Sequence, residues 1–346
     1  MFFYSWLNLG GQSPNIEGMN WWETFQNEAL LRNIYLAVLG AMFGSFASAA
    51  VYRIPEPGLS VLKPMRSFCP CCKAPIRWFD NLPILGYLIL RGRCRACKVG
   101  YGPGYLIHEV AVAALFVWAG QSWLMGVGPL AMAFALTALT ALWIAAAIDW
   151  QHFILPDGIT LGGIPFGILA AWLVPEFHLG AELDILPWGL SWFGLTLDAT
   201  PQKLVLISAI LGSSISFLFL IGIRAVFSYL LRQEALGLGD VKYMAAVGAL
   251  LGLEGAVWTL LIGVVAGAVL GLLNILRMIL VVAARRKARG RTRVLKNSTY
   301  MGWMLGRVFP FGPPLVLGTV LVMLAPENVR AFFLETWPQL VPYAVP

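Results

Sequence analysis

Long apolar runs separated by shorter polar loops most strongly restrict what this chain can fold into. A helix that crosses the hydrocarbon core of a bilayer needs about 20 predominantly apolar residues. Runs of roughly that kind cover about 31–52, 106–125, 128–148, 159–175, 203–224, 241–254, 256–282 and 312–326. The run at 241–254 is short and could pair with its neighbour as a tight hairpin. The pattern therefore predicts an all-α integral membrane protein with about eight transmembrane helices.

The composition agrees with lipid as the main solvent of the chain. Of the 346 residues, 59% are hydrophobic and 12% are charged, whereas a soluble domain is about half apolar and about a quarter charged. The first 30 residues hold Trp21, Trp22 and several acids, with no basic start followed by an apolar run. We therefore expect no cleaved secretory signal.

The charged residues predict an orientation in the membrane. Of the 24 Lys and Arg residues, nine lie between Arg53 and Lys98 and eight between Arg285 and Arg307, whereas the loop at 176–201 holds acids and no basic residue. Basic loops stay on the cytoplasmic side of a membrane. Loops 53–104, 225–240 and 283–307 are thus expected in the cytoplasm, and both termini on the other side of the membrane. The basic cluster that begins at Arg285 is expected to anchor the chain to anionic lipids, with a protein-binding site as the alternative, and the alternation of basic and acidic loops argues against nucleic-acid binding.

The insert at 53–104 holds all five cysteines. Cys69 and Cys72 form one C-x-x-C pair, and Cys94 and Cys97 form another. Two such pairs can offer four thiolates to a tetrahedral Zn²⁺, and a small loop-rich insert needs a metal to hold it together. Cys71 could replace Cys72, although the usual two-residue gap favours Cys72. The sequence therefore predicts a structural zinc-ribbon-like insert between the first two helices; a redox dithiol or ordinary buried thiols are the alternatives.

Two aspartates lie at the cytoplasmic ends of apolar runs and are candidate catalytic groups. Asp149 ends one run, and Asp240 begins another in the sequence Gly237-Leu238-Gly239-Asp240. Two carboxylates held close together share a proton, so one can activate water while the other donates to a carbonyl oxygen. Gly237 and Gly239 would let an extended substrate backbone approach.

Other readings of these residues remain open. Asp149 could reach interfacial water, Asp240 could be a helix N-cap, and Lys242 could extend to the membrane interface. Intramembrane acids also occur in proton-coupled transporters. A non-enzymatic membrane scaffold carrying a zinc ribbon is a further alternative.

A set of motifs in a fixed order resembles the bacterial type IV prepilin peptidase and N-methyltransferase family. The resemblance extends from about residue 40 to residue 315, and the double C-x-x-C between the first two helices makes it specific. The motifs are Gly44-Ser45-Phe46, Tyr52-Arg53-Ile54-Pro55, Arg66-Ser67-Phe68-Cys69-Pro70, Pro75-Ile76, Asp80-Asn81-Leu82-Pro83, Arg91-Gly92-Arg93-Cys94, Tyr105 with Glu109, Ile148-Asp149 followed by Leu155-Pro156-Asp157, Gly237-Leu238-Gly239-Asp240-Val241-Lys242 (the GxGD signature) and Phe309-Pro310-Phe311-Gly312-Pro313.

The resemblance implies a function. It makes Asp149 and Asp240 the catalytic pair of an aspartic endopeptidase, with Gly237, Gly239 and Lys242 beside the substrate backbone. The substrate would be a prepilin or pseudopilin, cut after the glycine that ends its basic leader. The new N-terminal residue would be methylated with S-adenosyl-L-methionine, and Glu109 is a candidate for holding its amino group. The family usually has Asn where this chain has Ser48.

These expectations divide the chain into five parts. They are an external segment (1–30), a first transmembrane helix (31–52), a cytoplasmic zinc-binding and methyltransferase domain (53–104), a transmembrane peptidase domain (105–330) and a tail (331–346). Membrane lipids and the pilus or secretion assembly machinery are expected partners. On charge alone, Asp80 or Glu234 could attract the basic leader.

Overall fold

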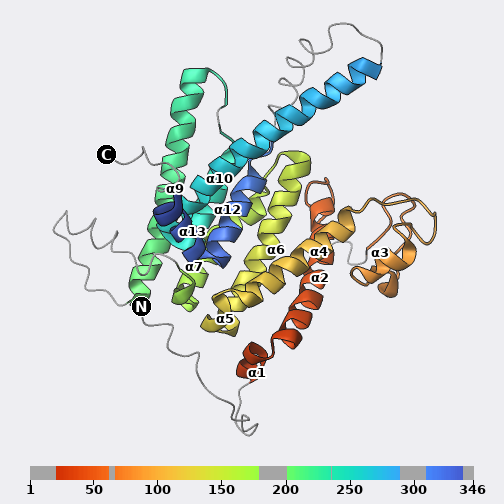
Figure 1. The fold of residues 1–346 in the computed structure, drawn as a ribbon, viewed down its shortest axis with the longest axis horizontal. Helices are drawn as coiled ribbons and strands as arrows, with labels where there is room; N and C mark the ends of the chain where they lie inside the picture. Colours follow the sequence, from red (N-terminus) through yellow and green to blue (C-terminus); the bar gives the residue numbers. More distant parts are fainter. Residues whose placement is uncertain (1–20, 62–66, 179–200, 235, 289–308, 338–346) are drawn as a thin grey trace, which may run out of the picture.

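The computed structural model describes residues 21–61, 67–178, 201–234, 236–288 and 309–337, which form a bundle of helices (Figure 1). Most of the expected external segment, most of the loop at 176–201 and of the basic stretch, and the end of the tail lie outside these residues. Within the described residues the only β-structure consists of two isolated bridges, so the all-α expectation is confirmed there. The helices are α1 (Trp21–Asn27), α2 (Ala29–Arg53), η1 (Trp78–Asn81), α3 (Leu85–Leu90), α4 (Gly104–Gln121), α5 (Leu124–Val127), α6 (Pro129–His152), α7 (Asp157–Leu173), η2 (Pro175–Phe177), α9 (Pro201–Leu231), α10 (Leu238–Ala288), α12 (Gly312–Leu324), α13 (Pro326–Ala331) and η4 (Phe332–Thr336).

Several of these helices are long and apolar enough to cross a membrane. Among the described residues four meet that condition: Ala29–Arg53, Pro129–His152, Gln202–Leu231 and Leu238–Arg285. The pair Gly312–Leu324 and Pro326–Thr336, bent by 109°, makes a fifth if it is one span. The chain is therefore a multi-pass membrane protein by length and composition, whereas the count of eight spans stays a prediction.

The long helix α10 reverses its direction at Gly252. Tyr243, before this glycine, places its hydroxyl 2.6 Å from the Thr319 hydroxyl of α12. Thr259, after it, places its carbonyl oxygen 2.7 Å from the position a Cβ would take at Gly318, the neighbour of Thr319. Residues 243 and 259 would lie about 24 Å apart in a straight helix. The two halves of α10 therefore run antiparallel to each other, and both pack against α12. This is the hairpin that the short run at 241–254 suggested.

Gly252 permits this reversal because its backbone takes φ 76° and ψ −179°. That region is essentially restricted to glycine, because a Cβ would clash with the backbone. There is also no room for a side chain at Gly252, since an added Cβ would lie 3.1 Å from the Ser208 hydroxyl of α9.

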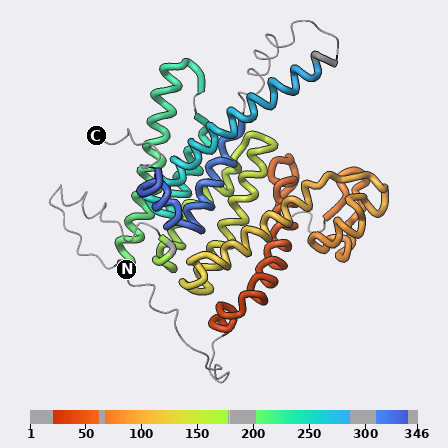
Figure 2. The backbone as a smooth tube through the Cα atoms, viewed as in Figure 1, coloured from red at the N-terminus to blue at the C-terminus, as the bar shows by residue number. Residues whose placement is uncertain are grey.

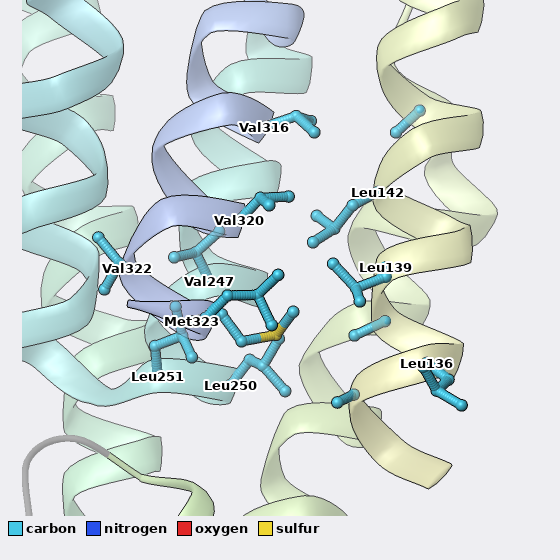
Figure 3. Packing of buried hydrophobic residues seen from close by; sticks show 14 of the residues in the cluster. Leu136, Leu139, Leu142, Val247, Leu250, Leu251, Val316, Val320, Val322 and Met323 are labelled. Carbon is cyan, nitrogen blue, oxygen red and sulfur yellow. The ribbon is translucent and has the colours of Figure 1, made fainter. Parts of the chain in front are cut away.

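The main hydrophobic core joins α6, α10 and α12. Figure 3 shows Leu139 and Leu142 of α6 facing Val320 and Met323 of α12, with Val247 of α10 beside them. All five side chains are at most 7% exposed. This core fixes the relative positions of the ends of α6, α10 and α12, where the candidate catalytic residues lie.

Helices α2 and α4 pack closely through small residues. A Cβ on Gly40 would lie 2.6 Å from the Ala113 Cα, and one on Gly44 would lie 2.5 Å from the Glu109 Cα. Small residues let the backbones of membrane helices approach in this way. The described part of the cysteine insert projects from the neighbouring ends of these two helices at the edge of the bundle (Figure 2).

Candidate active site and metal centre

Asp149 lies in the last turn of α6, and its carboxyl group is bound by the start of α12. The residue is 6% exposed, and its Oδ2 accepts a 2.8 Å hydrogen bond from the Gly312 N–H. Gly312 is the first residue of α12, where backbone N–H groups have no partner within the helix. A Cβ at Gly312 would lie 2.6 Å from the same Oδ2. The approach of α12 to Asp149 thus requires a glycine.

Asp240 enters the same site from the first turn of α10. This turn lies against the segment that follows Asp149, because Lys242 pairs with Asp157 and Gly239 packs on Leu155. Gly237 borders the Asp240 carboxyl, because an added Cβ would lie 3.0 Å from its Oδ2. Gly239 packs against the segment that follows α6, because a Cβ added to it would lie 3.1 Å from the Leu155 Cβ. The structure therefore brings together both predicted acids and both predicted glycines.

Lys242 links the segment that holds Asp240 to the segment that follows Asp149. Its Nζ lies 2.8 Å from the Asp157 Oδ1 in an ion pair between α10 and α7. Asp157 is the first residue of α7. The ammonium group of Lys242 therefore has a partner within the chain, and its predicted place beside the substrate backbone stays a prediction.

The sequence did not predict that the Gly312 N–H binds the carboxyl group of Asp149. The segment Phe309–Pro313 was recognised as a motif, but nothing in it indicates contact with Asp149, 163 residues earlier. An aromatic contact supports the same approach, because the rings of Trp150 and Phe309 meet edge-to-face at 5.8 Å.

The two C-x-x-C pairs form two turns with the same backbone pattern. In each turn, the N–H of the first cysteine donates a hydrogen bond to the carbonyl of the residue five positions later. The carbonyl of that cysteine accepts a hydrogen bond from the N–H of the residue four positions later. The residue after each second cysteine, Lys73 or Lys98, has a positive φ of 57° or 59°. The bonds are Cys69 N–H to Ala74 O, Lys73 N–H to Cys69 O, Cys94 N–H to Val99 O and Lys98 N–H to Cys94 O.

The two turns bring four thiols into one cluster that fits zinc. The Sγ atoms of Cys69 and Cys97 are 3.9 Å apart, those of Cys72 and Cys94 are 4.0 Å apart, and all four lie within 4.8 Å of one another. Tetrahedral Zn–S bonds of about 2.3 Å place the sulfurs about 3.8 Å apart. Cys71 is exposed and outside the cluster.

The pKa of one thiol of the cluster, Cys94, is shifted toward the metal-binding form, whereas that of Cys97 is raised. Backbone N–H groups of Cys97 and Ala96 lower the pKa of the Cys94 thiol to about 7. A thiol with that pKa is about half ionised at neutral pH, and the thiolate is the form that binds metal.

Glu109 does not belong to the metal cluster. It is 7% exposed, and its Oε2 accepts a 2.7 Å hydrogen bond from the Ile84 N–H of the insert. It lines a cavity of about 700 Å³ between α2, α4 and the insert. The neighbouring His108 accepts a 3.0 Å hydrogen bond from the Trp143 Nε1–H of α6. Ser48, at the position where Asn is usual, lines the same cavity and donates to the Gly44 carbonyl.

The two acids considered for the leader both have cationic partners. Arg95 binds Asp80 through two hydrogen bonds of 2.6 and 2.8 Å, and its guanidinium holds the pKa of Asp80 below its usual range. Arg224 lies 3.1 Å from Glu234. Neither carboxylate therefore offers an unpaired negative charge to a basic leader.

Comparison with known proteins accounts for this combination of sites. Residues 38–123, which include the cysteine insert, match the bacterial peptidase A24 N-terminal domain, and residues 136–272 match the type IV leader peptidase family. A prepilin leader peptidase/N-methyltransferase of Klebsiella pneumoniae is 36% identical over 66% of this chain and 89% of its own length. The chain belongs to the type IV leader peptidase family.

Two further relatives are similar to this chain at lower identity. A prepilin leader peptidase/N-methyltransferase of Burkholderia pseudomallei is 33% identical over 69% of this chain and 75% of its own length. A protein with the same name from Neisseria gonorrhoeae is 28% identical over 85% of this chain and 90% of its own length. No solved structure matches the chain with significance.

Proposed function

We propose that this protein cleaves the leader from type IV prepilins or type II secretion pseudopilins at the cytoplasmic face of the bacterial inner membrane, and then N-methylates the new N-terminal residue. Membership of the type IV leader peptidase family and relatives named prepilin leader peptidase/N-methyltransferase support both activities. The observation that carries the proposal is the placement of two aspartates from different helices: the turn that holds Asp240 packs against the segment that follows Asp149, through Gly239 on Leu155 and the Lys242–Asp157 ion pair.

The peptidase step needs only this pair and a water molecule. One aspartate in its charged form takes a proton from water, and the resulting nucleophile attacks the scissile carbonyl carbon. The other, protonated, aspartate donates to the carbonyl oxygen, because two adjacent carboxyls share one proton. The C–N bond then breaks as the first aspartate gives the proton it took from water to the leaving amine, and the carbonyl oxygen returns its proton to the second aspartate. The Gly312 N–H fixes the orientation of the Asp149 carboxyl. Gly237 is exposed and leaves room beside Asp240 for an extended substrate.

The substrate would enter from the membrane. Its apolar helix would pack among the spans while its basic leader stays in the cytoplasm, because charged residues are costly in the bilayer. Exposed apolar side chains on α9 and the second half of α10 provide a surface for lipid or for such a helix. The pilus or secretion assembly machinery, which receives the mature subunits, is a further expected partner.

The cysteine domain would carry the methylation. Zn²⁺ bound by Cys69, Cys72, Cys94 and Cys97 would hold the two turns together, since the four sulfurs fit a tetrahedral ion. S-adenosyl-L-methionine would supply the methyl group. Glu109 would hold the amino group of the new N-terminus, because its carboxylate faces the cavity between α4 and the cysteine domain. The basic insert would face the cytoplasm, as the charge distribution favours.

Family membership disfavours the two alternatives. A proton-coupled transporter would carry its acids along a path across the membrane, whereas the turn that holds Asp240 packs against the segment that follows Asp149. A scaffold without activity would need neither acid.

Incubating the purified protein with a full-length prepilin in lipid, with and without S-adenosyl-L-methionine, tests both activities. Mass spectrometry should find loss of the leader in both samples and an added methyl group only with the donor. An uncut prepilin from well-folded protein, over several leader sequences, would refute the peptidase. A cut but never methylated product would refute the second activity alone.

A further inference from the structure

We propose that one face of α3, in the cysteine domain, docks on the surface of an anionic lipid bilayer, with Arg91 and Arg93 binding the lipid headgroups. The face consists of Leu85, Leu88 and Ile89, which are 55%, 57% and 67% exposed. Residues three and four positions apart lie on the same side of a helix, so these large aliphatic side chains form one apolar face. The inference adds to the proposed function a contact between the cysteine domain and the membrane.

The opposite side of α3 is already covered by the cysteine domain itself. Gly86 is buried, and a Cβ added to it would collide with the Asp80 carbonyl oxygen of η1. Tyr87 and Leu90 are partly buried and line the cavity between α2, α4 and the insert. The apolar face is therefore the side of α3 that the described residues leave open. Contiguous apolar faces of this kind on a protein surface mark sites of interaction with a protein or a membrane.

The start of α3 is held beside the helices of the bundle rather than beyond their ends. The Ile84 N–H, one residue before α3, donates a 2.7 Å hydrogen bond to the Glu109 Oε2. Glu109 is the sixth residue of α4, about 8 Å along the helix axis from its start. It packs against Gly44, which lies about 14 Å before the end of the candidate membrane span α2. Figure 1 likewise shows α3 at the side of the bundle, where an apolar face meets the edge of a bilayer.

The charge around this face selects an anionic bilayer as its partner. The insert at 53–104 carries nine basic residues and two acids. Arg91 and Arg93 directly follow α3, are exposed, and take part in no ion pair among the described residues. Trp78 of η1 is 79% exposed, and tryptophan is enriched where membrane and water meet. An apolar helix face beside basic residues and tryptophan is typical of helices that lie in the surface of an anionic membrane.

Photo-cross-linking of the full-length protein in lipid nanodiscs tests the inference. The photoreactive residue p-benzoylphenylalanine is introduced at Leu88 or, as a matched control, at Leu90 on the covered side of the same helix. The nanodiscs contain phosphatidylcholine with a minority of phosphatidylglycerol. Mass spectrometry should find severalfold more lipid adduct at position 88 than at position 90. At position 88 the anionic lipid should be enriched over its share in the nanodisc.

The arginines are tested in the protein that carries the probe at Leu88. Arg91→Gln and Arg93→Gln should lower the enrichment of the anionic lipid on the order of fivefold for each arginine removed. Arg285→Gln, which removes an exposed arginine of α10, should leave the enrichment unchanged. Bound zinc and the thermal midpoint are compared with those of the wild type in every variant. If the probe at Leu90 alters them, Val99, which also lines the cavity, takes its place.

Three results would overturn the inference. They are adducts at position 88 to another protein or a second copy of this chain in place of lipid, equal lipid adducts at the exposed and the covered position, and an anionic lipid that is not enriched. The cross-linking needs no prepilin, and leader cleavage by the same samples is measured separately. Absent lipid contact with intact cleavage would therefore refute this inference alone, whereas lipid contact without cleavage would refute only the proposed function.

Discussion

Replacing Gly312 with alanine should disable cleavage without touching either aspartate. The new Cβ would lie 2.6 Å from the Asp149 Oδ2 and 2.9 Å from its Cγ, closer than real Cβ atoms come to other atoms. Either the carboxyl group turns away or α12 moves, and both break the 2.8 Å bond from the Gly312 N–H. A hydrogen bond to a charged group contributes about 1.5–3 kcal/mol. If that amount is lost from the transition state, kcat falls by about 10- to 150-fold.

The assay is the initial rate of leader removal from a saturating prepilin in lipid. Gly271→Ala is the matched control, because this glycine lies in α10 and nothing lies within 4 Å of an added Cβ. It should cleave at the wild-type rate. The reasoning fails if Gly312→Ala, with an unchanged thermal midpoint, also cleaves at that rate, since Asp149 would then not depend on the start of α12.

Two further predictions concern stability and metal. Gly252→Ala should destabilise the protein by about 1–3 kcal/mol, because φ 76° with ψ −179° suits glycine alone; a thermal midpoint equal to that of Gly271→Ala would contradict the hairpin. The purified protein should carry one zinc per chain by metal analysis, lost in Cys72→Ser and kept in Cys71→Ser, because only Cys72 lies in the four-sulfur cluster. Retention of zinc by Cys72→Ser would instead identify Cys71 as the ligand.

The sequence predicted the parts of this structure that have a local signature. Apolar runs marked the helices, because a bilayer imposes a minimum length, and two C-x-x-C pairs marked the metal turns, because their spacing is set by a tight backbone bend. Even the hairpin in α10 was indicated, since the run at 241–254 is too short to stand alone. The position of its turn at Gly252 was not indicated, because a run of small and apolar residues does not show which glycine has a positive φ.

Contacts between distant segments were harder to predict. The bond from Gly312 to Asp149 spans 163 residues, and the ion pair of Lys242 with Asp157 spans 85. Both depend on how α6, α7, α10 and α12 pack, which hydrophobicity alone does not specify, since lipid and helix surfaces are equally apolar. Charge alone likewise did not indicate that Asp80 and Glu234 pair with Arg95 and Arg224, and their attraction for a basic leader stays a prediction.

The central claim is that Asp149 and Asp240 together hydrolyse the leader peptide bond. The most direct test compares leader removal by wild type, Asp149→Asn and Asp240→Asn, with Glu327→Gln as a control for loss of an acid elsewhere. Asparagine keeps the shape of each side chain but can no longer exchange a proton, so each single variant should lose about 10²–10⁴-fold in rate while Glu327→Gln keeps full activity. Wild-type cleavage by either asparagine variant would contradict the account.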